Sequence, residues 1–388
     1  VNVADSNYTE LAALDRWLTE LDGLYTEGAE SNEVIELDQE ARARLASLGY
    51  LGTFAAEIEE GEILPNPRDK IGVYNELLRA KQLKLRGQPE EAVAVLEEIL
   101  AADDRVIDAY ITLGSLYSQM QRHEEAIVTL ETALGHKPGD LSLVLLLVSQ
   151  NVKLARYDRA LEVIADFEEF LPEDPRLYYT RGNLRRYKGE TEAAIADYER
   201  SLAINPDAAP AWAALAGTRV AAGRFGAARE AADRALAIDP DIADGNFVRG
   251  QLLQRDRDLH GAETAYLREL EVSPRHLRAA YNLSIVYREI GQEPEEERYL
   301  RRAIEINPDF PLSHLYLARL YMINEQNLEE AIRIAEWAAG QQLTDPDLAF
   351  AYFLLADLYS RVGDEQRSLE NLRRAQAIQQ RLTRDATR

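Results

Sequence analysis

Residues 209–240, APAWAALAGTRVAAGRFGAAREAADRALAIDP, decide the fold of this 388-residue chain. Apolar residues recur at helical spacing before and after Gly223, which predicts two helices joined by a turn. Pro240 ends the second helix, because proline cannot continue the backbone hydrogen-bond ladder. The stretch therefore predicts a helical hairpin.

The hairpin recurs along the chain. Six prolines stand 34 residues apart: Pro138, Pro172, Pro206, Pro240, Pro274 and Pro308. Twelve residues before each proline lies a small residue, replaced by glutamate in the last copy: Ala126, Ala160, Ala194, Ala228, Ala262 and Glu296. Small residues at a fixed phase indicate helices that cross closely, and a fixed period of this length is typical of a repeat solenoid. A solenoid grows by stacking neighbouring units and needs no single large core.

One copy carries the pattern with particular clarity, at Tyr110, Leu113, Gly114, Tyr117, Ala126, Ala133 and Pro138. In these residues the chain resembles the tetratricopeptide repeat family. The resemblance implies an all-α, right-handed superhelical solenoid of about nine helical hairpins. Phasing on this copy predicts units that begin at Val73, Ile107, Leu141, Pro175, Ala209, Ala243, Leu277, Pro311 and Ala349.

The predicted repeats fill residues 73–382, between an acidic N-terminal extension (1–72) and a short C-terminal tail (383–388). The eighth unit is longer than the others, so we expect its loops at 324–327 and 343–345 to bulge.

Composition excludes several function classes. The formal net charge is −24, from 44 basic and 68 acidic residues, which argues against a nucleic-acid partner. The chain has no cysteine and therefore no disulfide, thiol chemistry or cysteine-bound zinc. The longest apolar run, 141–148, is far shorter than the roughly 20 residues that cross a bilayer, and we interpret it as a buried helix of the third repeat.

No arrangement typical of catalysis is recognisable. We interpret the five scattered histidines as surface or loop residues without a metal site: His123, His136, His260, His276 and His314. Asp239, Asp241 and Asp244 resemble the start of a calcium loop, but Ala243 stands where a ligand is needed. We therefore predict a non-catalytic chain with no cofactor and no metal.

The N-terminal extension holds sixteen acidic and five basic residues and does not follow the repeat period. Its apolar residues recur every three or four positions, at Leu11, Leu14, Leu18, Leu21 and Tyr25. This spacing predicts an amphipathic helix over about 9–25, and a second short helix is predicted over 38–48. Asn7 begins a glycosylation sequon and is the candidate site; Asn282 also begins one but falls within a predicted helix.

Residues 38–52 (DQEARARLASLGYLG) and 64–70 (LPNPRDK) resemble the junction that follows the catalytic domain in bacterial sulfatase-like proteins with C-terminal tetratricopeptide repeats. The resemblance implies an extracytoplasmic or secreted location in a bacterium, with the cytoplasm left open. No catalytic residue of that family is carried over. The chain opens on Val1 in what reads as folded sequence, so we expect a longer precursor.

The resemblance also implies where a partner binds. In this family, ligands touch positions 2, 5, 9, 12 and 13 of each unit, on the first helices. Here position 5 is apolar in every unit, and these positions together hold ten basic and four acidic residues. We therefore expect a groove for a protein or peptide of acidic and apolar character, contacted by Tyr74, Leu77, Lys81, Lys84, Ile111, Leu145, Arg176, Tyr179, Asn183, Arg186, Phe247, Arg255, Arg278, Tyr281, Arg288, Leu315, Arg319, Phe353 and Arg361.

Other interpretations stay open. The apolar row can be internal helix packing, with the arginines solvated or paired to neighbouring repeats. The chain can also assemble head to tail into a filament, through an acidic N-terminal face and a basic, uncapped C-terminal end. The residues for this self-association are Leu11, Leu14, Leu18, Leu21, Phe350, Phe353, Arg373, Arg374 and Arg381. In a third interpretation, the chain is the C-terminal interaction region of a larger sulfatase-like enzyme.

Overall fold

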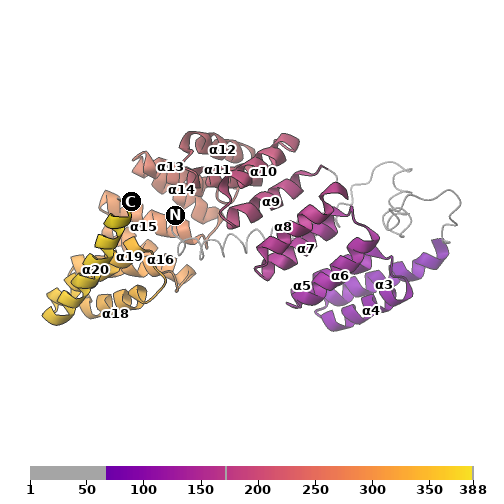
Figure 1. Cartoon of the computed structure of the whole chain (residues 1–388), viewed down its shortest axis with the longest axis horizontal. Helices are drawn as coiled ribbons and strands as arrows, with labels where there is room; N and C mark the ends of the chain where they lie inside the picture. Colours follow the sequence, from indigo (N-terminus) through magenta and orange to yellow (C-terminus); the bar gives the residue numbers. More distant parts are fainter. Residues whose placement is uncertain (1–66, 171–172, 387–388) are drawn as a thin grey trace. The chain divides into compact units, whose positions relative to one another are not determined.

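A computed structural model of the chain describes residues 67–170 and 173–386. Within these ranges it contains eighteen α-helices, one 3₁₀ turn and no strand, so the predicted all-α solenoid of nine hairpins is confirmed (Figure 1). Among these residues, no helix combines the length and apolar character that crossing a bilayer requires.

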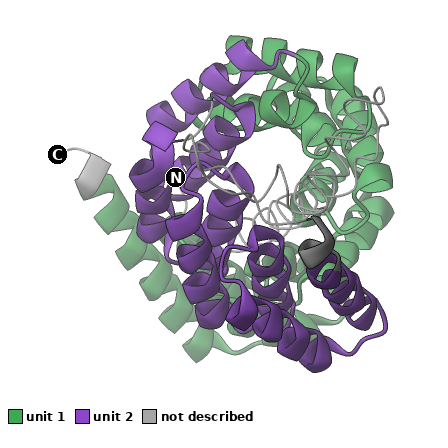
Figure 2. Cartoon of the chain, turned by 90° about the vertical axis from the view of Figure 1, so that its right-hand side faces the viewer, with its two compact units in different colours: residues 1–15, 207–388 green, residues 16–206 purple. Residues whose placement is uncertain are grey.

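The chain divides into two units, which Figure 2 colours separately. The boundary follows Pro206. The described part of unit 2 contains α3 (Pro67–Leu85), α4 (Pro89–Ala102), α5 (Ile107–Gln119), α6 (His123–His136), α7 (Leu141–Lys153), α8 (Tyr157–Phe167), the 3₁₀ turn η1 (Glu168–Phe170), α9 (Pro175–Tyr187) and α10 (Thr191–Ile204). The described part of unit 1 contains α11 (Ala209–Ala221), α12 (Phe225–Ile238), α13 (Gly245–Arg255), α14 (Leu259–Val272), α15 (Leu277–Ile290), α16 (Glu293–Ile306), α17 (Pro311–Ile323), α18 (Leu328–Ala339), α19 (Asp345–Arg361) and α20 (Glu365–Ala386).

Each hairpin pairs an odd-numbered first helix with the even-numbered second helix that follows it. The alanines twelve residues before the prolines are fully buried, as Ala126 and Ala228 illustrate. Close approach is also visible at Gly114, where an added Cβ would lie 3.0 Å from Leu130 Cδ2. The predicted close crossing of helices is therefore confirmed.

The turn between the two helices of each hairpin contains one residue with positive φ at a constant position. Five of these nine residues are glycine: Gly87, Gly189, Gly223, Gly291 and Gly363. The other four are Gln121, Ala155, Arg257 and Glu325. Glycine adopts this left-handed conformation without the steric cost that a Cβ brings, so the four non-glycine turns are strained.

The eighth hairpin has the bulging loops expected from its length. Its turn contains two residues with positive φ, Glu325 and Asn327, and α18 starts one position later than the second helices before it. Residues 340–344 then separate α18 from α19.

The ends of the repeat region differ from the predicted boundaries. The first helix, α3, begins at Pro67 rather than near residue 73, and α20 continues to Ala386 through most of the predicted tail. Gln376, on α20, is exposed at the position where α12 and α14 carry the buried Leu236 and Leu270.

We expect the Ala155→Gly substitution to stabilise the fold. Ala155 is exposed and has a φ of 55°, so glycine removes the steric cost of the left-handed conformation, which outweighs the larger entropy of its unfolded chain. The thermal unfolding midpoint should rise, corresponding to roughly 0.5–1 kcal/mol. Ala237→Gly is the control, because Ala237 is exposed within α12 and glycine there should lower the midpoint. A lower unfolding midpoint in both variants would contradict the inference that the backbone at Ala155 is strained.

Candidate functional site on the first helices of unit 1

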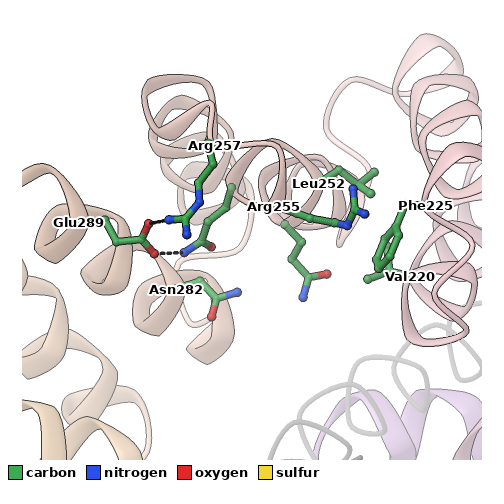
Figure 3. A pocket seen from close by; sticks show the side chains of 9 residues that line it. Val220, Phe225, Leu252, Arg255, Arg257, Asn282 and Glu289 are labelled. Carbon is green, nitrogen blue, oxygen red and sulfur yellow. Dashed lines mark hydrogen bonds and ion pairs between the residues drawn. The ribbon is translucent and has the colours of Figure 1, made fainter.

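A cavity of about 430 Å³ opens on three consecutive first helices of unit 1 (Figure 3). We call it the α13 pocket, because α13 contributes more lining residues than any other helix. It is lined by Val220, Phe225, Gln251, Leu252, Gln254, Arg255, Arg257, Asn282 and Glu289. In repeat numbering, Gln251, Gln254 and Arg255 occupy positions 9, 12 and 13, so the pocket lies where the family resemblance predicts ligand contacts.

On one side of the pocket, Arg255 is held against an aromatic ring. Its guanidinium carbon lies 3.9 Å from the centroid of Phe225 (Figure 3). Its Nη1 also donates a hydrogen bond of 3.1 Å to Asp256 Oδ1. The cation–π contact restricts the side chain while leaving the arginine exposed. The pocket therefore presents a positioned arginine that pairs with Asp256, a carboxylate that Arg229 also contacts.

On the other side, a chain of hydrogen bonds fixes two amide side chains. Arg257 Nη1 donates to Glu289 Oε2 at 2.8 Å, and Gln254 Nε2 lies 3.5 Å from Glu289 Oε1 (Figure 3). Gln254 Oε1 accepts a bond of 3.0 Å from the Tyr266 hydroxyl, which accepts a bond of 3.3 Å from Asn282 Nδ2. Tyr266 is fully buried, and this burial raises the pKa of its hydroxyl.

This arrangement offers groups that suit the recognition of a ligand. Its lining residues offer one guanidinium held on a ring, several amide groups and the apolar side chains of Val220 and Leu252. None of these described lining residues is a serine, cysteine or histidine. Such a set can bind a carboxylate together with a peptide backbone.

The sequence matches the tetratricopeptide repeat models over residues 83–150, 186–246 and 247–311. The chain belongs to the tetratricopeptide repeat family. The matched ranges begin after the segments that resemble the sulfatase-like junction, most of which lie outside the described residues, so that resemblance stays a prediction.

Three curated relatives are similar to parts of this chain. The mouse and human "Protein O-mannosyl-transferase TMTC1" are 26% and 28% identical over 181 and 175 residues, which are 47% and 44% of this chain. "Anaphase-promoting complex subunit 3" of Schizosaccharomyces pombe is 23% identical over 180 residues, or 46% of this chain. The matches cover 16%, 20% and 26% of these proteins, so the chain spans about a quarter of their length or less.

Two solved structures illustrate the likeness of fold. The structure described as "Functional Characterization of Pseudomonas Aeruginosa pilF" has a TM-score of 0.46 and 22% identity, covering 51% of this chain and 88% of that one. MamA from Desulfovibrio magneticus RS-1 has a TM-score of 0.38 and 18% identity, covering 42% and 93%. Both likenesses are limited to the repeat architecture.

The predicted apolar groove row of this tetratricopeptide chain is largely internal. Leu77 belongs to a core cluster, Leu315 is fully buried, and Phe247 packs on Tyr266 and His276 with ring centroids 5.9 and 4.7 Å away. The side chains of these three residues are used in packing within the chain. Tyr74, Ile111, Tyr179 and Tyr281 are half-buried, and Phe353 is exposed.

Several predicted groove arginines are paired within the protein, as the alternative interpretation allowed. Arg176 bonds Asp174 at 2.9 Å, and Arg361 lies between Asp357 and Glu325 at 3.1 and 3.3 Å. Their charge is already matched, so the inner face is less available to an acidic partner than the residue count indicates.

Two further groove arginines, Arg288 and Arg319, interact electrostatically with a buried glutamate. Glu296 replaces the crossing alanine of the seventh repeat and is buried, which raises the pKa of its carboxyl. Arg319 lies 3.7 Å from it and, like Arg288, favours its charged form. Arg288 also lies over the Tyr316 ring, 4.5 Å from the centroid. Lys81 is exposed, and Lys84, Arg186 and Arg278 are partly exposed.

Sequence reasoning missed most of the α13 pocket. Charge and apolar character mark Arg255 but not the neutral amide side chains of Gln251, Gln254 and Asn282. The sequence does contain a signal for this pocket, since amide side chains occupy the ligand-contact positions 9 and 12 of the sixth repeat. Phe225 is the first residue of the second helix α12 and Arg257 belongs to a hairpin turn, and the position rule covers neither.

His276 lies in a loop, as the prediction allows, but it is buried. Only 5% of its surface is exposed, and its Nε2 lies 2.8 Å from Asp244 Oδ1 and 3.8 Å from Glu269 Oε1. Glu269 stands where four of the other repeats carry alanine, and its carboxylate accepts hydrogen bonds from the backbone of Asp244 and Phe247. The glutamate thereby caps α13, which starts two positions later than α11 and α15 do in their repeats.

Asp244, Glu269 and His276 are close enough to suggest a metal site. His276 Nδ1, however, accepts a hydrogen bond of 3.0 Å from the Ala279 backbone, so the proton of the neutral ring is on Nε2. That proton is donated to Asp244, and no lone pair remains on Nε2 for a metal. The three residues form a structural network.

Other predicted residues fall into two groups. Leu11, Leu14, Leu18, Leu21 and the sequon Asn7 lie outside the described residues. At the C-terminal end, Phe350 is half-buried, Arg373 is exposed, Arg374 pairs with Glu370, and Arg381 pairs with Asp345. Asn282 lies in α15, as predicted, with its side-chain nitrogen bonded to Tyr266.

We expect Gly250→Ala to disrupt the α13 pocket. A Cβ at this position would lie 2.5 Å from Tyr266 Cε1, so the ring must move and its hydroxyl must leave Gln254 and Asn282. The cost should be about 1–3 kcal/mol, seen as a lower thermal unfolding midpoint. In Gly217→Ala the nearest atom is Val248 Cγ2 at 3.7 Å, so this helix substitution should be neutral or stabilising. Equal effects of the two substitutions would argue against the close contact.

The Glu269 network predicts a pH dependence. Burial raises the pKa of the Glu269 carboxyl, so the folded chain holds this proton more readily than the unfolded chain. The resulting stabilisation is present at low pH and is lost as the pH rises through the raised pKa. The free energy of unfolding, compared with that of a Glu269→Gln variant, should therefore increase as the pH falls from 7 toward 4.5. Denaturant titrations at several pH values measure it, with Glu230→Gln on the exposed face of α12 as control. A difference in the free energy of unfolding between the natural chain and Glu269→Gln that does not change with pH would contradict the prediction.

Proposed function

We propose that this chain is a non-catalytic scaffold that binds an extended segment of another protein at the α13 pocket. The observation that carries the proposal is Arg255, held 3.9 Å above the Phe225 ring and next to amide side chains fixed by hydrogen bonds. A positioned guanidinium is a strong and selective binding group for a carboxylate, because the cost of ordering its side chain is already met.

The partner is of acidic and apolar character. Its carboxylate pairs with Arg255, and a neighbouring apolar side chain contacts Val220, Phe225 or Leu252. Gln251 and Asn282, on successive first helices, bond the peptide backbone between them. An extended peptide suits a site spread over three repeats, since its backbone offers donors and acceptors along its whole length.

A function in protein interaction is compatible with the printed names of the relatives. One is by name a subunit of a complex, and the matched part of the transferases is at most a fifth of their length. We do not propose transferase activity for this chain, because the described residues bring together no nucleophile and base.

Peptide binding tests the proposal. A random dodecapeptide library is selected against the full chain, and a selected peptide is synthesised with a fluorophore. We expect selected peptides to combine acidic and aliphatic residues, and Arg255→Glu to weaken binding at least tenfold, since one charge-assisted hydrogen bond contributes about 1.5–3 kcal/mol. Fluorescence anisotropy measures the dissociation constant.

The matched control is Arg234→Glu, which makes the same charge change at an exposed position of the second helix α12. Its effect should be small. An equal loss in both variants would show that the net charge of the chain, rather than the α13 pocket, decides binding.

Two other proposals have less support. Head-to-tail self-assembly relies on a C-terminal end where Phe353 is exposed in a cavity of about 550 Å³, but Gln376, Gln379 and Gln380 give that cavity a polar lining. An extracytoplasmic location, as the tail of a sulfatase-like enzyme, rests on the sequence resemblance at 38–52 and 64–70 alone. Mass spectrometry of peptides from the native protein, searching for sequence upstream of Val1, tests the latter.

A further inference from the structure

The backbone at Arg257 is strained, at a turn position that most repeats fill with glycine. Arg257 lies in the turn between α13 and α14 and has a φ of 66°. Five of the nine residues at this position in the described hairpins are glycine, which adopts the left-handed conformation without a steric cost. A strained residue that persists where glycine suits the backbone points to a role for its side chain.

The side chain of Arg257 contributes little to stability. It is 80% exposed, and its Nη1 donates a hydrogen bond of 2.8 Å to Glu289 Oε2 on α15 (Figure 3). An ion pair this exposed is weak, because water screens the attraction and a long side chain must be ordered. The ion pair therefore does not offset the strain of the left-handed backbone, and stability alone does not account for an arginine here.

The side chain of Arg257 instead reaches the α13 pocket. Arg257 and Glu289 both line that cavity, and Glu289 occupies the ligand-contact position 13 of the seventh repeat. The Glu289 carboxylate also lies 3.5 Å from the side-chain nitrogen of Gln254. Among the described residues that line the pocket, Glu289 is the one with a negative charge, and Arg257 is paired with it.

The eighth hairpin has the same arrangement with the charges reversed. Its turn residue Glu325 also has a positive φ, of 50°, and lies 3.3 Å from Arg361. Arg361 is at position 13 of the ninth repeat, as Glu289 is in the seventh. A charged turn residue can thus reach position 13 of the following repeat and neutralise the charge that this position presents.

The ion pair between Arg257 and Glu289 sets the charge of the α13 pocket. The charged residues of its lining are Arg255, Arg257 and Glu289, with a net charge of +1, and without Arg257 the net charge is zero. Arg255 is itself paired with Asp256. Without Arg257, the Glu289 carboxylate would repel the carboxylate of an approaching segment and attract an ammonium or guanidinium group.

We propose that Arg257 determines the specificity of the α13 pocket for an acidic segment, by neutralising Glu289. The inference rests on the proposed function, because it concerns the same bound peptide. Arg255 pairs with the carboxylate of the partner, whereas Arg257 acts through Glu289 and is a positioning residue. The strained turn is retained because selectivity, rather than stability, depends on this side chain.

The Arg257→Gly substitution tests the inference with the fluorescent peptide selected against the natural chain. We expect the dissociation constant of this acidic peptide to rise about fivefold, which corresponds to one unit charge at a distance of about 4 Å in water. The thermal unfolding midpoint should not fall, since glycine relieves the strain. Ala155→Gly relieves the same strain in unit 2 and should leave the dissociation constant unchanged. An unchanged affinity in Arg257→Gly would overturn the inference.

A second substitution separates neutralisation of Glu289 from a direct contact between Arg257 and the peptide. In the variant with both Arg257→Gly and Glu289→Gln, the net charge of the lining is again +1, so the affinity for the acidic peptide should return to that of the natural chain. If the double variant binds as weakly as Arg257→Gly, neutralisation is not the role of Arg257.

A change of preference is the readout that a merely structural role would not produce. The selected peptide is resynthesised with lysine in place of its acidic residues, and this basic peptide should bind Arg257→Gly more tightly than it binds the natural chain. Equal binding would overturn the inference. If Arg255→Glu weakens binding of the acidic peptide and Arg257→Gly does not, only the role of Arg257 is wrong. If neither substitution changes binding, the peptide does not bind at the α13 pocket, and the proposed function is wrong as well.

Discussion

The structure depends on close crossing of the two helices in each hairpin, which requires a small residue at one fixed position. The fully buried alanines Ala126, Ala160, Ala194, Ala228 and Ala262 supply it. Once the helices cross at this distance, every hairpin presents its apolar surface to the next, and the stack grows by repetition. The turn residue with positive φ follows from the same geometry, because the chain must reverse within a few residues whether or not glycine is present.

At two positions this chain departs from the repeat pattern, and each departure introduces a buried glutamate with its own interactions. Glu296 replaces the crossing alanine and brings Arg319 and Arg288 to its carboxylate, which uses charge that a partner could otherwise bind. Glu269 replaces a second small residue and takes over the capping of α13, with Asp244 and His276 completing the network. The same helix carries Gln251, Gln254 and Arg255, so its position, and with it the α13 pocket, depends on a buried glutamate that the repeat pattern does not call for.

The two units use the same architecture differently. In unit 1, polar side chains on the first helices are organised by hydrogen bonds around an open pocket. In unit 2, α7 is apolar on nearly all sides and closed at its ligand-contact positions.

The sequence by itself determined the hairpins, their number, the family and the long eighth repeat, because proline, glycine and alanine act through local backbone geometry that a fixed period makes visible. It also identified the positions on which a binding face is built. Only the tertiary structure decided which side chains are available there. Leu77, Phe247 and Leu315 are used in packing, Arg176 and Arg361 are paired, and His276 is buried beside two carboxylates. These outcomes depend on contacts between residues of neighbouring helices and repeats, often 30 or more positions apart, and a one-dimensional pattern does not contain the distances that set them.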